Sequence, residues 1–166
     1  MKYHLFKLTC ECETIYDPES NVDCPNCHKA HMCHKELTLD IDKFLSIIYE
    51  LNSDNKPDAA MDLIFDVYFN LHDRFDIMNI IVEKIDVKKI NLSLMIGFLV
   101  QTFKYIKQVP AHSLLCDRVA HRALEIGEPE ERIHKLVDKY RTTGNYWEDM
   151  KMFGAPEIIT GPKPNE

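Results

Sequence analysis

Residues 8–28 read LTCECETIYDPESNVDCPNCH and decide how the first part of this chain folds. The stretch holds two close cysteine pairs, Cys10-Glu-Cys12 and Cys24-Pro-Asn-Cys27, with eleven residues between them. Two such pairs can bring four thiolates around one tetrahedral Zn²⁺. We therefore expect a single structural zinc ion, because four protein ligands leave no open position for water or substrate.

Strand-like segments flank the two pairs. Lys2 to Thr9 is rich in aromatic and branched residues, and Lys29 to Leu37 can return antiparallel to it. The intervening Asp17-Pro-Glu-Ser-Asn21 has the composition of a turn. A hairpin of this size buries too little apolar area to be stable alone. The metal is therefore expected to supply the folding energy, on the order of 10 kcal/mol or more.

The cysteine pairs resemble those of the zinc-ribbon family. The likeness covers residues 1–37 and consists of Cys10, Cys12, Cys24 and Cys27. Cys-Pro-x-Cys suits a tight knuckle because proline fixes a backbone dihedral there. The first pair departs from the commoner Cys-x-x-Cys by one residue. Zinc ribbons contact DNA, RNA or protein, so the resemblance implies a fold and names no partner.

A second group of metal-ligating residue types follows at once, formed by His28, His31, Cys33 and His34. His28 or His31 is an alternative ligand for the zinc ion, or a group that donates to thiolate sulfur. The four residues are also candidates for a second metal site together with His4. The simpler interpretation is a row of solvated residues, since no fixed set of them alternates onto one strand face.

From Leu39 the apolar period changes from two to about 3.6, which predicts helices. We expect about six antiparallel helices with short connections. Asp40 and Asp42 lie where the cap of the first is expected, and the others cover about 57–71, 75–84, 92–107, 111–126 and 130–140. The fourth is apolar nearly all round, which is typical of a central helix. The predicted fold class is α+β, with a zinc-ribbon β-hairpin (1–37), a helical domain (38–142) and a C-terminal tail (143–166).

The helical part also resembles a module of uncharacterised bacterial and bacteriophage proteins. The residues that carry the likeness are Ala60-Met-Asp-Leu-Ile-Phe-Asp, Arg74-Phe-Asp, Ile85-Asp-Val and Leu94-Met-Ile-Gly-Phe-Leu, within residues 58–124. This resemblance implies a helical fold in a bacterial or phage setting and brings no activity with it.

Composition and charge exclude some classes of protein. The chain is 45% hydrophobic and 28% charged, as in a soluble globular protein. Its formal charge of −7 argues against a protein that mainly coats nucleic acid. The longest apolar run, Ile90 to Phe103, is too short to span a membrane. Paired cysteines without an export signal predict a reducing compartment, so we expect a cytoplasmic protein.

Other polar residues are weaker candidates for function. A basic helix edge for phosphate would consist of Arg118, Arg122, Arg132, Lys135 and Lys139, although acidic residues are interleaved with it. His112 and Cys116 have the spacing of a helical base–nucleophile pair, and Asp58, Asp62 and Asp66 line one helix edge. A buried structural cysteine and a solvated acidic face are the commoner explanations.

The tail carries Tyr146, Trp147, Met150 and Phe153 close together, which are residue types that anchor protein interfaces. They form either a docking motif or a part of the protein's own core. Taken together, the sequence predicts a non-catalytic zinc-containing binding or adaptor protein that contacts another protein in a larger assembly. The alternative is a transcription-related regulator that binds nucleic acid through the ribbon and the basic helix edge.

Overall fold

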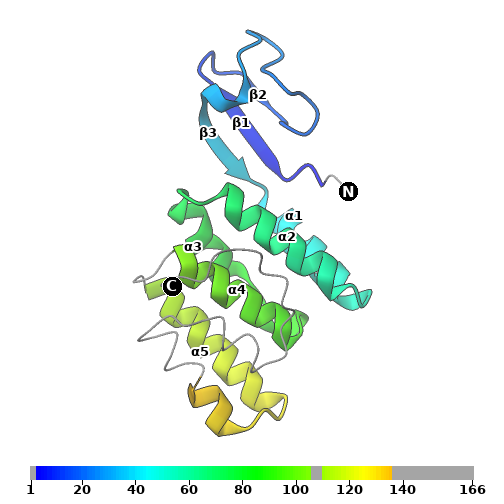
Figure 1. Cartoon of the computed structure of the whole chain (residues 1–166), viewed down its shortest axis with the longest axis vertical. Coiled ribbons are helices and arrows are strands. Elements are labelled where there is room, and N and C mark those ends of the chain that lie inside the picture. Colours follow the sequence, from blue (N-terminus) through cyan, green and yellow to red (C-terminus); the bar gives the residue numbers. More distant parts are fainter. Residues whose placement is uncertain (1–2, 106–109, 136–166) are drawn as a thin grey trace, which may run out of the picture. The chain divides into compact units, whose positions relative to one another are not determined.

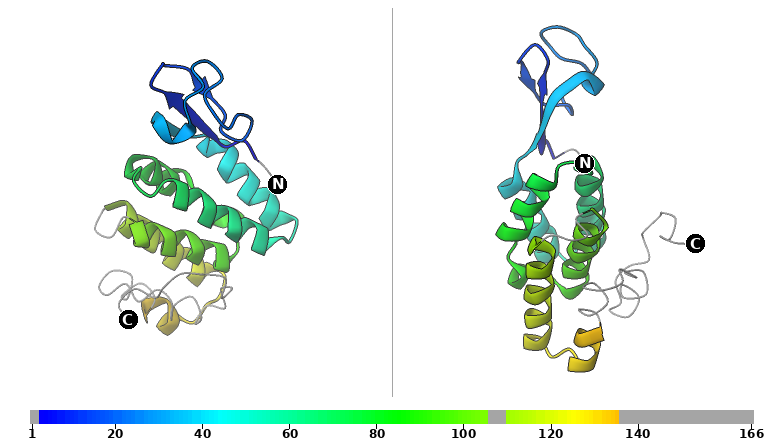
Figure 2. Two further views of the ribbon diagram at one scale, coloured as in Figure 1. Left: turned by 45° about the horizontal axis from the view of Figure 1, so that its top comes forward. Right: turned by 90° about the vertical axis from the view of Figure 1, so that its left-hand side faces the viewer.

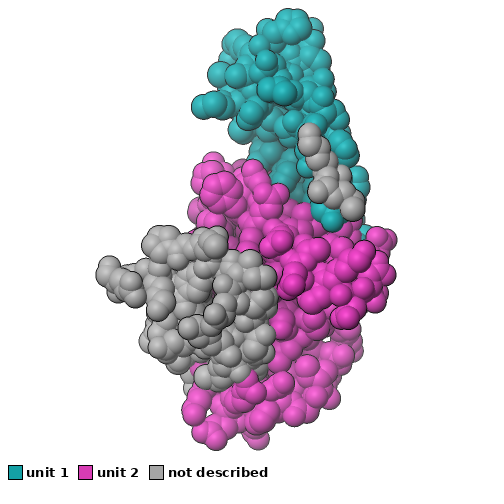
Figure 3. Space-filling view, turned by 45° about the vertical axis from the view of Figure 1, so that its right-hand side comes forward, with its two compact units in different colours: residues 1–46 teal, residues 47–166 magenta. Residues whose placement is uncertain are grey.

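The computed structural model of this protein describes residues 3–105 and 110–135, without the side chains of residues 110–113. Figures 1 and 2 show a small β-sheet followed along the chain by α-helices. The chain divides into two compact units, residues 1–46 and residues 47–166, which are coloured separately in Figure 3. Helix α1 (Ile41–Ser53) contributes residues to both units.

The first unit contains a three-stranded antiparallel sheet of strand order β2-β1-β3. The strands are β1 (Phe6–Cys10), β2 (Ile15–Tyr16) and β3 (His34–Leu39). In the central strand, Phe6, Leu8 and Cys10 are buried, which follows from the period of two of a pleated strand. Leu8 lies opposite Tyr16 on one side and Leu37 on the other.

The predicted α+β class is confirmed, with a three-stranded sheet in place of a hairpin. Strand β2 was not predicted, because its two residues directly precede the turn of residues 17–21. The returning strand also begins later than predicted, at His34. Residues 31–33 form the short 3₁₀ helix η1 (His31–Cys33) instead, and residues 24–29 are folded into a cysteine loop.

The first helix begins at a capping signal that the sequence predicts. Asp40 caps α1, since its carboxylate accepts a hydrogen bond from the amide of Lys43 at 3.1 Å. Asn55 and Gly127 have positive φ of 56° and 88° and terminate α1 and α5. The other elements are α2 (Pro57–Asn70), α3 (Phe75–Lys84), η2 (Val87–Lys89), α4 (Leu92–Tyr105) and α5 (Pro110–Glu125).

A sixth helical segment covers residues 130–135, where the described part of the chain ends. The observed boundaries of α3 match the predicted range of residues 75–84. Helix α5 begins one residue earlier than predicted, with Pro110 as its first residue. Proline suits that position since its missing N–H would have no partner within the helix.

Helix α4 forms the centre of the helical unit, as its apolar sequence predicts. It packs against both α2 and α5, and Figures 1 and 2 show it between them. Phe98 is buried and meets the ring of Tyr68 edge-on, with 6.3 Å between the ring centroids. The hydroxyl of Tyr68, which is also buried, forms a 3.1 Å hydrogen bond with Thr102. The hydroxyls of Tyr68 and Thr102 are thus paired inside this core.

Candidate metal centre

Cys10 and Cys12 belong to a tight loop at the end of β1. The amide of Cys10 donates to the carbonyl of Thr14, and the amide of Glu13 donates to the carbonyl of Cys10, both at 2.9 Å. Glu13 closes the loop in the left-handed conformation, with a φ of 68°. The loop places Cys10 in the interior and leaves Cys12 at the surface.

Cys24 and Cys27 belong to a second loop with the same plan and one more residue. The amide of Cys24 donates to the carbonyl of Lys29, and the amide of His28 donates to the carbonyl of Cys24, both at 2.9 Å. His28 has a φ of 59° and directly follows the second cysteine, as Glu13 does in the first loop. The Cys-x-Cys spacing of the first pair therefore shortens the loop by one residue without changing its closure.

The two loops bring all four sulfur atoms together. Each lies within 4.8 Å of the others. The Cys10 and Cys27 sulfurs are 3.4 Å apart, and those of Cys12 and Cys24 are 3.6 Å apart. Disulfide-bonded sulfurs would be about 2.05 Å apart, so these cysteines are free thiols. The cluster predicted from the sequence is thus formed, and it could hold one metal ion.

Neighbouring side chains hold the cluster in place. Leu8 and Tyr16 form a small buried core with Cys10 and Cys24, and Leu37 packs against it. The side-chain amide of Asn26 donates to the Cys12 sulfur at 3.6 Å. Sequence reasoning missed Asn26 as a contributor, although its place within Cys-Pro-Asn-Cys was a usable signal. Groups that donate to ligand sulfurs orient them and stabilise their negative charge.

The thiols differ strongly in acidity. Hydrogen bonds with the side chain and backbone of Thr14, and then with Asn26, lower the pKa of Cys12 to about 5. The backbone amides of Cys27 and Asn26 likewise lower the pKa of Cys24, against the effect of burial. For Cys10, the Cys12 amide lowers the pKa, but burial and hydrogen bonds with the other thiols outweigh it and raise the pKa to about 12. A metal ion would displace the proton of Cys10.

The histidines that follow the second pair are not part of this cluster among the described residues. His28 is exposed and takes up the loop-closing position. Ring nitrogen Nδ1 of His31 lies 3.0 Å from the Val22 carbonyl oxygen, and Nδ1 of His34 lies 2.8 Å from that of His31. These rings thus brace the loop between the second cysteine pair and β3. Cys33 is exposed and outside the cluster.

A second group with metal-ligand spacing consists of His4, Asp17 and Glu19. Its polar atoms already bond to one another. His4 Nδ1 lies 2.6 Å from an Asp17 carboxylate oxygen, and the His4 amide donates to Glu19 at 2.6 Å. The amide of Glu19 and the hydroxyl of Ser20 also donate to Asp17. We interpret the group as a hydrogen-bonded link between His4, which precedes β1, and the turn after β2.

Each described member of the predicted basic edge has an acceptor in the protein. Arg118 donates to the Val82 carbonyl oxygen at 2.8 Å. The other three meet carboxylates three or four residues away in the sequence: Arg122 with Glu125, Arg132 with Glu128, and Lys135 with Glu131. Lys139 lies outside the described residues. Most of the positive charge of this edge is therefore locally balanced.

The remaining candidates do not form a reactive site among the described side chains. Cys116 is fully buried, and the side chain of its predicted partner His112 lies outside the description. Asp58, Asp62 and Asp66 are exposed and do not form a group of metal-ligand spacing in the described chain. Tyr146, Trp147, Met150 and Phe153 lie outside the described residues.

No protein-family model matches this chain, and neither does any curated protein or solved structure that was compared with it. The resemblance to the zinc ribbon therefore depends on the four-cysteine cluster, and that of residues 58–124 depends on the sequence alone. Within the described residues, none of the helices has the length and apolar character needed to cross a membrane.

Proposed function

We propose that this protein is a non-catalytic zinc protein of the cytoplasm whose N-terminal unit binds another protein. The proposal has three parts, which are the identity of the metal, the absence of catalysis and the nature of the partner.

Zinc fits the donor set of the cysteine cluster. A Zn²⁺ ion bound to four thiolates at about 2.3 Å has sulfur–sulfur edges of about 3.8 Å. The 3.4 and 3.6 Å separations between sulfurs from different loops are close to that value. Soft thiolates favour zinc over magnesium or calcium. Cys10, Cys12, Cys24 and Cys27 would hold the ion, and its role would be to stabilise the fold of the N-terminal unit.

A non-catalytic role is supported by the ligand set and by the burial of Cys116. Four protein ligands leave no coordination position for a substrate or an activated water. Cys116 is 0% exposed, which keeps its sulfur from a substrate in this conformation.

The observation that carries the binding proposal is the exposure of large apolar side chains beside the metal loops. Val22 is 76% exposed and Met32 is 83% exposed. They lie near each other, because His31 next to Met32 contacts the carbonyl of Val22. Exposed apolar groups on a braced loop are suited to contact with a protein partner. The nearby lysines Lys29 and Lys35 pair with Glu11 and Glu13, so this region has little free charge for a nucleic acid.

Affinity purification of the zinc-loaded chain from its native host tests the proposal. The double variant Val22→Ser/Met32→Ser should lose the protein partner and keep one zinc ion per chain, measured by mass spectrometry and metal analysis. Phe69→Ser, at a side chain that is 69% exposed in the helical unit, is the matched control and should keep the partner. Deletion of residues 143–166 tests the tail as a second contact.

Two results would contradict the proposal. In the first, the double variant keeps every partner that the unmodified chain captures. In the second, the chain binds nucleic acid instead, with an affinity that falls steeply as salt is added. The second result would favour the nucleic-acid-binding regulator.

A further inference from the structure

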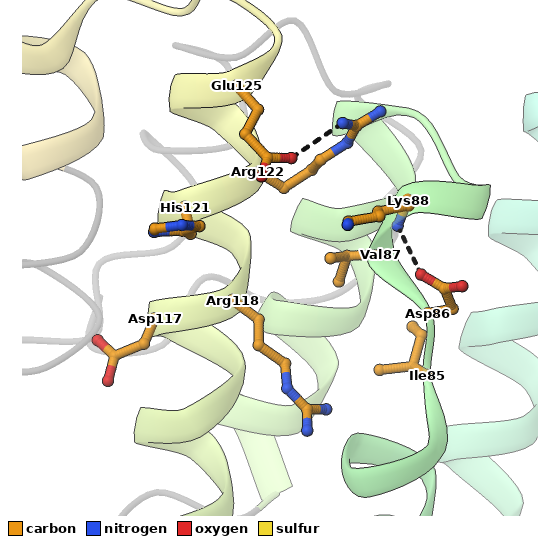
Figure 4. A pocket seen from close by; sticks show the side chains of 9 residues that line it. All are labelled: Ile85, Asp86, Val87, Lys88, Asp117, Arg118, His121, Arg122 and Glu125. Atoms are coloured by element: carbon orange, nitrogen blue, oxygen red, sulfur yellow. Dashed lines mark hydrogen bonds and ion pairs between the residues drawn. The ribbon is translucent and has the colours of Figure 1, made fainter.

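A pocket of about 460 Å³ lies in the helical unit between η2 and α5 (Figure 4). Its volume falls in the range of about 300–1,000 Å³ that is typical of small-molecule sites. Ile85 and Val87 give it an apolar part, and charged residues of α5 and η2 surround them. The two elements are separated by about twenty residues in the sequence, so the fold creates this site.

The η2 side of the pocket is fixed by the rest of the helical unit. The amide of Asp86 donates to the Tyr49 hydroxyl at 2.9 Å. Asn52 donates to the Lys89 carbonyl at 3.2 Å and accepts from the Asn91 amide at 2.9 Å. These bonds hold η2 from both ends. A ligand would therefore meet a preformed wall and would not need to order it.

Arg118 is held in place from the α5 side. Its Nη1 donates to the carbonyl oxygens of Val82 and Glu83, at 2.8 and 3.3 Å. A guanidinium carries five N–H donors in a planar fork. Among the described residues none accepts from Nε or Nη2 of Arg118, so these donors remain for a ligand. In Figure 4 the side chain reaches from α5 towards Ile85.

Lys88 extends from η2 towards α5 in Figure 4. The nearest carboxylate of its own segment, that of Asp86, accepts from the Lys88 amide at 3.0 Å and not from the ammonium. Glu125 pairs with Arg122 at 3.0 Å. Asp117 projects in Figure 4 from the opposite edge of α5. Among the described residues, neither Lys88 nor Arg118 forms an ion pair with a carboxylate, although the Arg122 hydrogen bond acts together with the charge of Lys88 to lower the pKa of Glu125.

Arg122 adds a second indication of a ligand. Its Nε is buried and has no hydrogen-bond acceptor in the described part of the chain. A buried donor without a partner is rare in folded proteins, and a bound water or ligand is one explanation for it. Arg122 lines the same pocket.

We propose that this pocket binds a small organic anion, whose phosphate or carboxylate group is held by Arg118 and Lys88 and whose apolar part lies on Ile85 and Val87. The site is independent of the metal centre and of the partner-binding function proposed above. Recognition would follow the usual pairing of an oxyanion with charged N–H donors.

Titration of the zinc-loaded full-length chain with phenyl phosphate and with benzoate, followed by NMR or calorimetry, tests this site. Saturable binding of at least one of the two supports the proposal, and their relative affinities identify the preferred oxyanion. Lys88→Gln should weaken binding about tenfold, because one charge-assisted hydrogen bond is lost. The lysine is exposed, so the variant should fold normally. Lys56→Gln, at an exposed lysine outside the pocket, is the matched control and should change the affinity less than about twofold.

Three results would overturn the proposal. The first is the absence of saturable binding of either anion at about 10 mM, a concentration at which even weak specific sites fill. The second is an equal loss of affinity in the Lys88 and Lys56 variants, which would indicate general attraction to the surface. The third is equally strong binding of benzylammonium, which has the opposite charge.

Discussion

The two units of this protein reach a defined fold by different means. In the first unit, the buried cluster beside the two cysteine loops consists of Leu8, Cys10, Tyr16 and Cys24, so half of its members are cysteines. In the helical unit, α4 alone buries residues from Leu94 to Phe103 without interruption. The comparison indicates that apolar burial is sufficient for the helices, whereas the small sheet depends on what its sulfurs bind.

Loss of the metal should have the largest effect, and it should be confined to one unit. With zinc at the proposed site, Cys24→Ser or removal of the metal by a chelator would take away on the order of 10 kcal/mol of folding energy. We expect the sheet to unfold while the helical circular dichroism signal and the NMR resonances of α2–α5 persist. Cys33→Ser is the control, because Cys33 is exposed and outside the cluster. Joint unfolding of both units would contradict the claim that the helices are stable without the metal.

Truncation of a core side chain in the helical unit should destabilise the helices and leave the metal centre intact. Phe98→Ala removes a buried ring beside Tyr68 and should lower the unfolding free energy of the helices by about 3–5 kcal/mol. Denaturant titration measures this loss, and the zinc content should remain one ion per chain. Phe69→Ala, at an exposed ring, should cost less than about 0.5 kcal/mol. A lower zinc content in the Phe98 variant would contradict the separation of the units.

Acidification should weaken the metal centre and leave the helices unaffected. Zinc binds thiolates, and the pKa of Cys10 is raised to about 12, so zinc at the proposed site would have to displace its proton throughout the neutral range. Each displaced proton should lower the apparent zinc affinity about tenfold per pH unit as the pH falls. Competition with a chelator between about pH 6 and pH 8 measures this slope. A pH-independent affinity would contradict the proposed zinc site.

The lowered pKa of Cys12 has the opposite consequence for the small fraction of the metal-free first unit that stays folded. It is about 5 in the folded state, below the ordinary thiol value. Ionised Cys12 therefore stabilises the folded state fully when the pH is above the ordinary thiol pKa. This stabilisation is lost as the pH falls through about 5. The pKa of Cys10 is raised, so its protonated thiol stabilises the folded state fully when the pH is below the ordinary thiol pKa. This stabilisation is lost as the pH rises through about 12.

The smallest predicted effect concerns the two loop-closing residues. His28 has a φ of 59°, and this left-handed conformation costs a residue with a side chain about 1 kcal/mol more than it costs glycine. His28→Gly should therefore raise the resistance of the first unit to chelator by up to about 1 kcal/mol. Glu13→Gly should give a smaller gain, because it also removes the exposed ion pair with Lys35. Asn21→Gly, at a residue without positive φ, is the control and should not stabilise. A loss of zinc affinity in His28→Gly would instead indicate that the imidazole contributes to the centre.

Local signals predicted much of this structure. The spacing of the four cysteines gave the sulfur cluster, and the capping residue Asp40 and the apolar period gave the helices. Strand β2 could not be predicted in this way, because two residues are too few for a periodic signal. The link from His4 to Asp17 and the contact from Asn26 to Cys12 arise from side-chain placement in three dimensions. The pocket proposed to bind an anion is lined by residues of η2 and α5, which are far apart in the sequence, so the sequence did not predict it either.

The order of the cysteines along the chain also affects how the protein is made. All four precede residue 28, ahead of every helix of the second unit. A ribosome adds about 5–20 residues per second, and domains generally fold as units with the N-terminal one first. The nascent chain therefore presents its complete thiolate set for several seconds before α5 exists. A metal ion bound at the proposed site could therefore fold the first unit while the helices of the second are still being made.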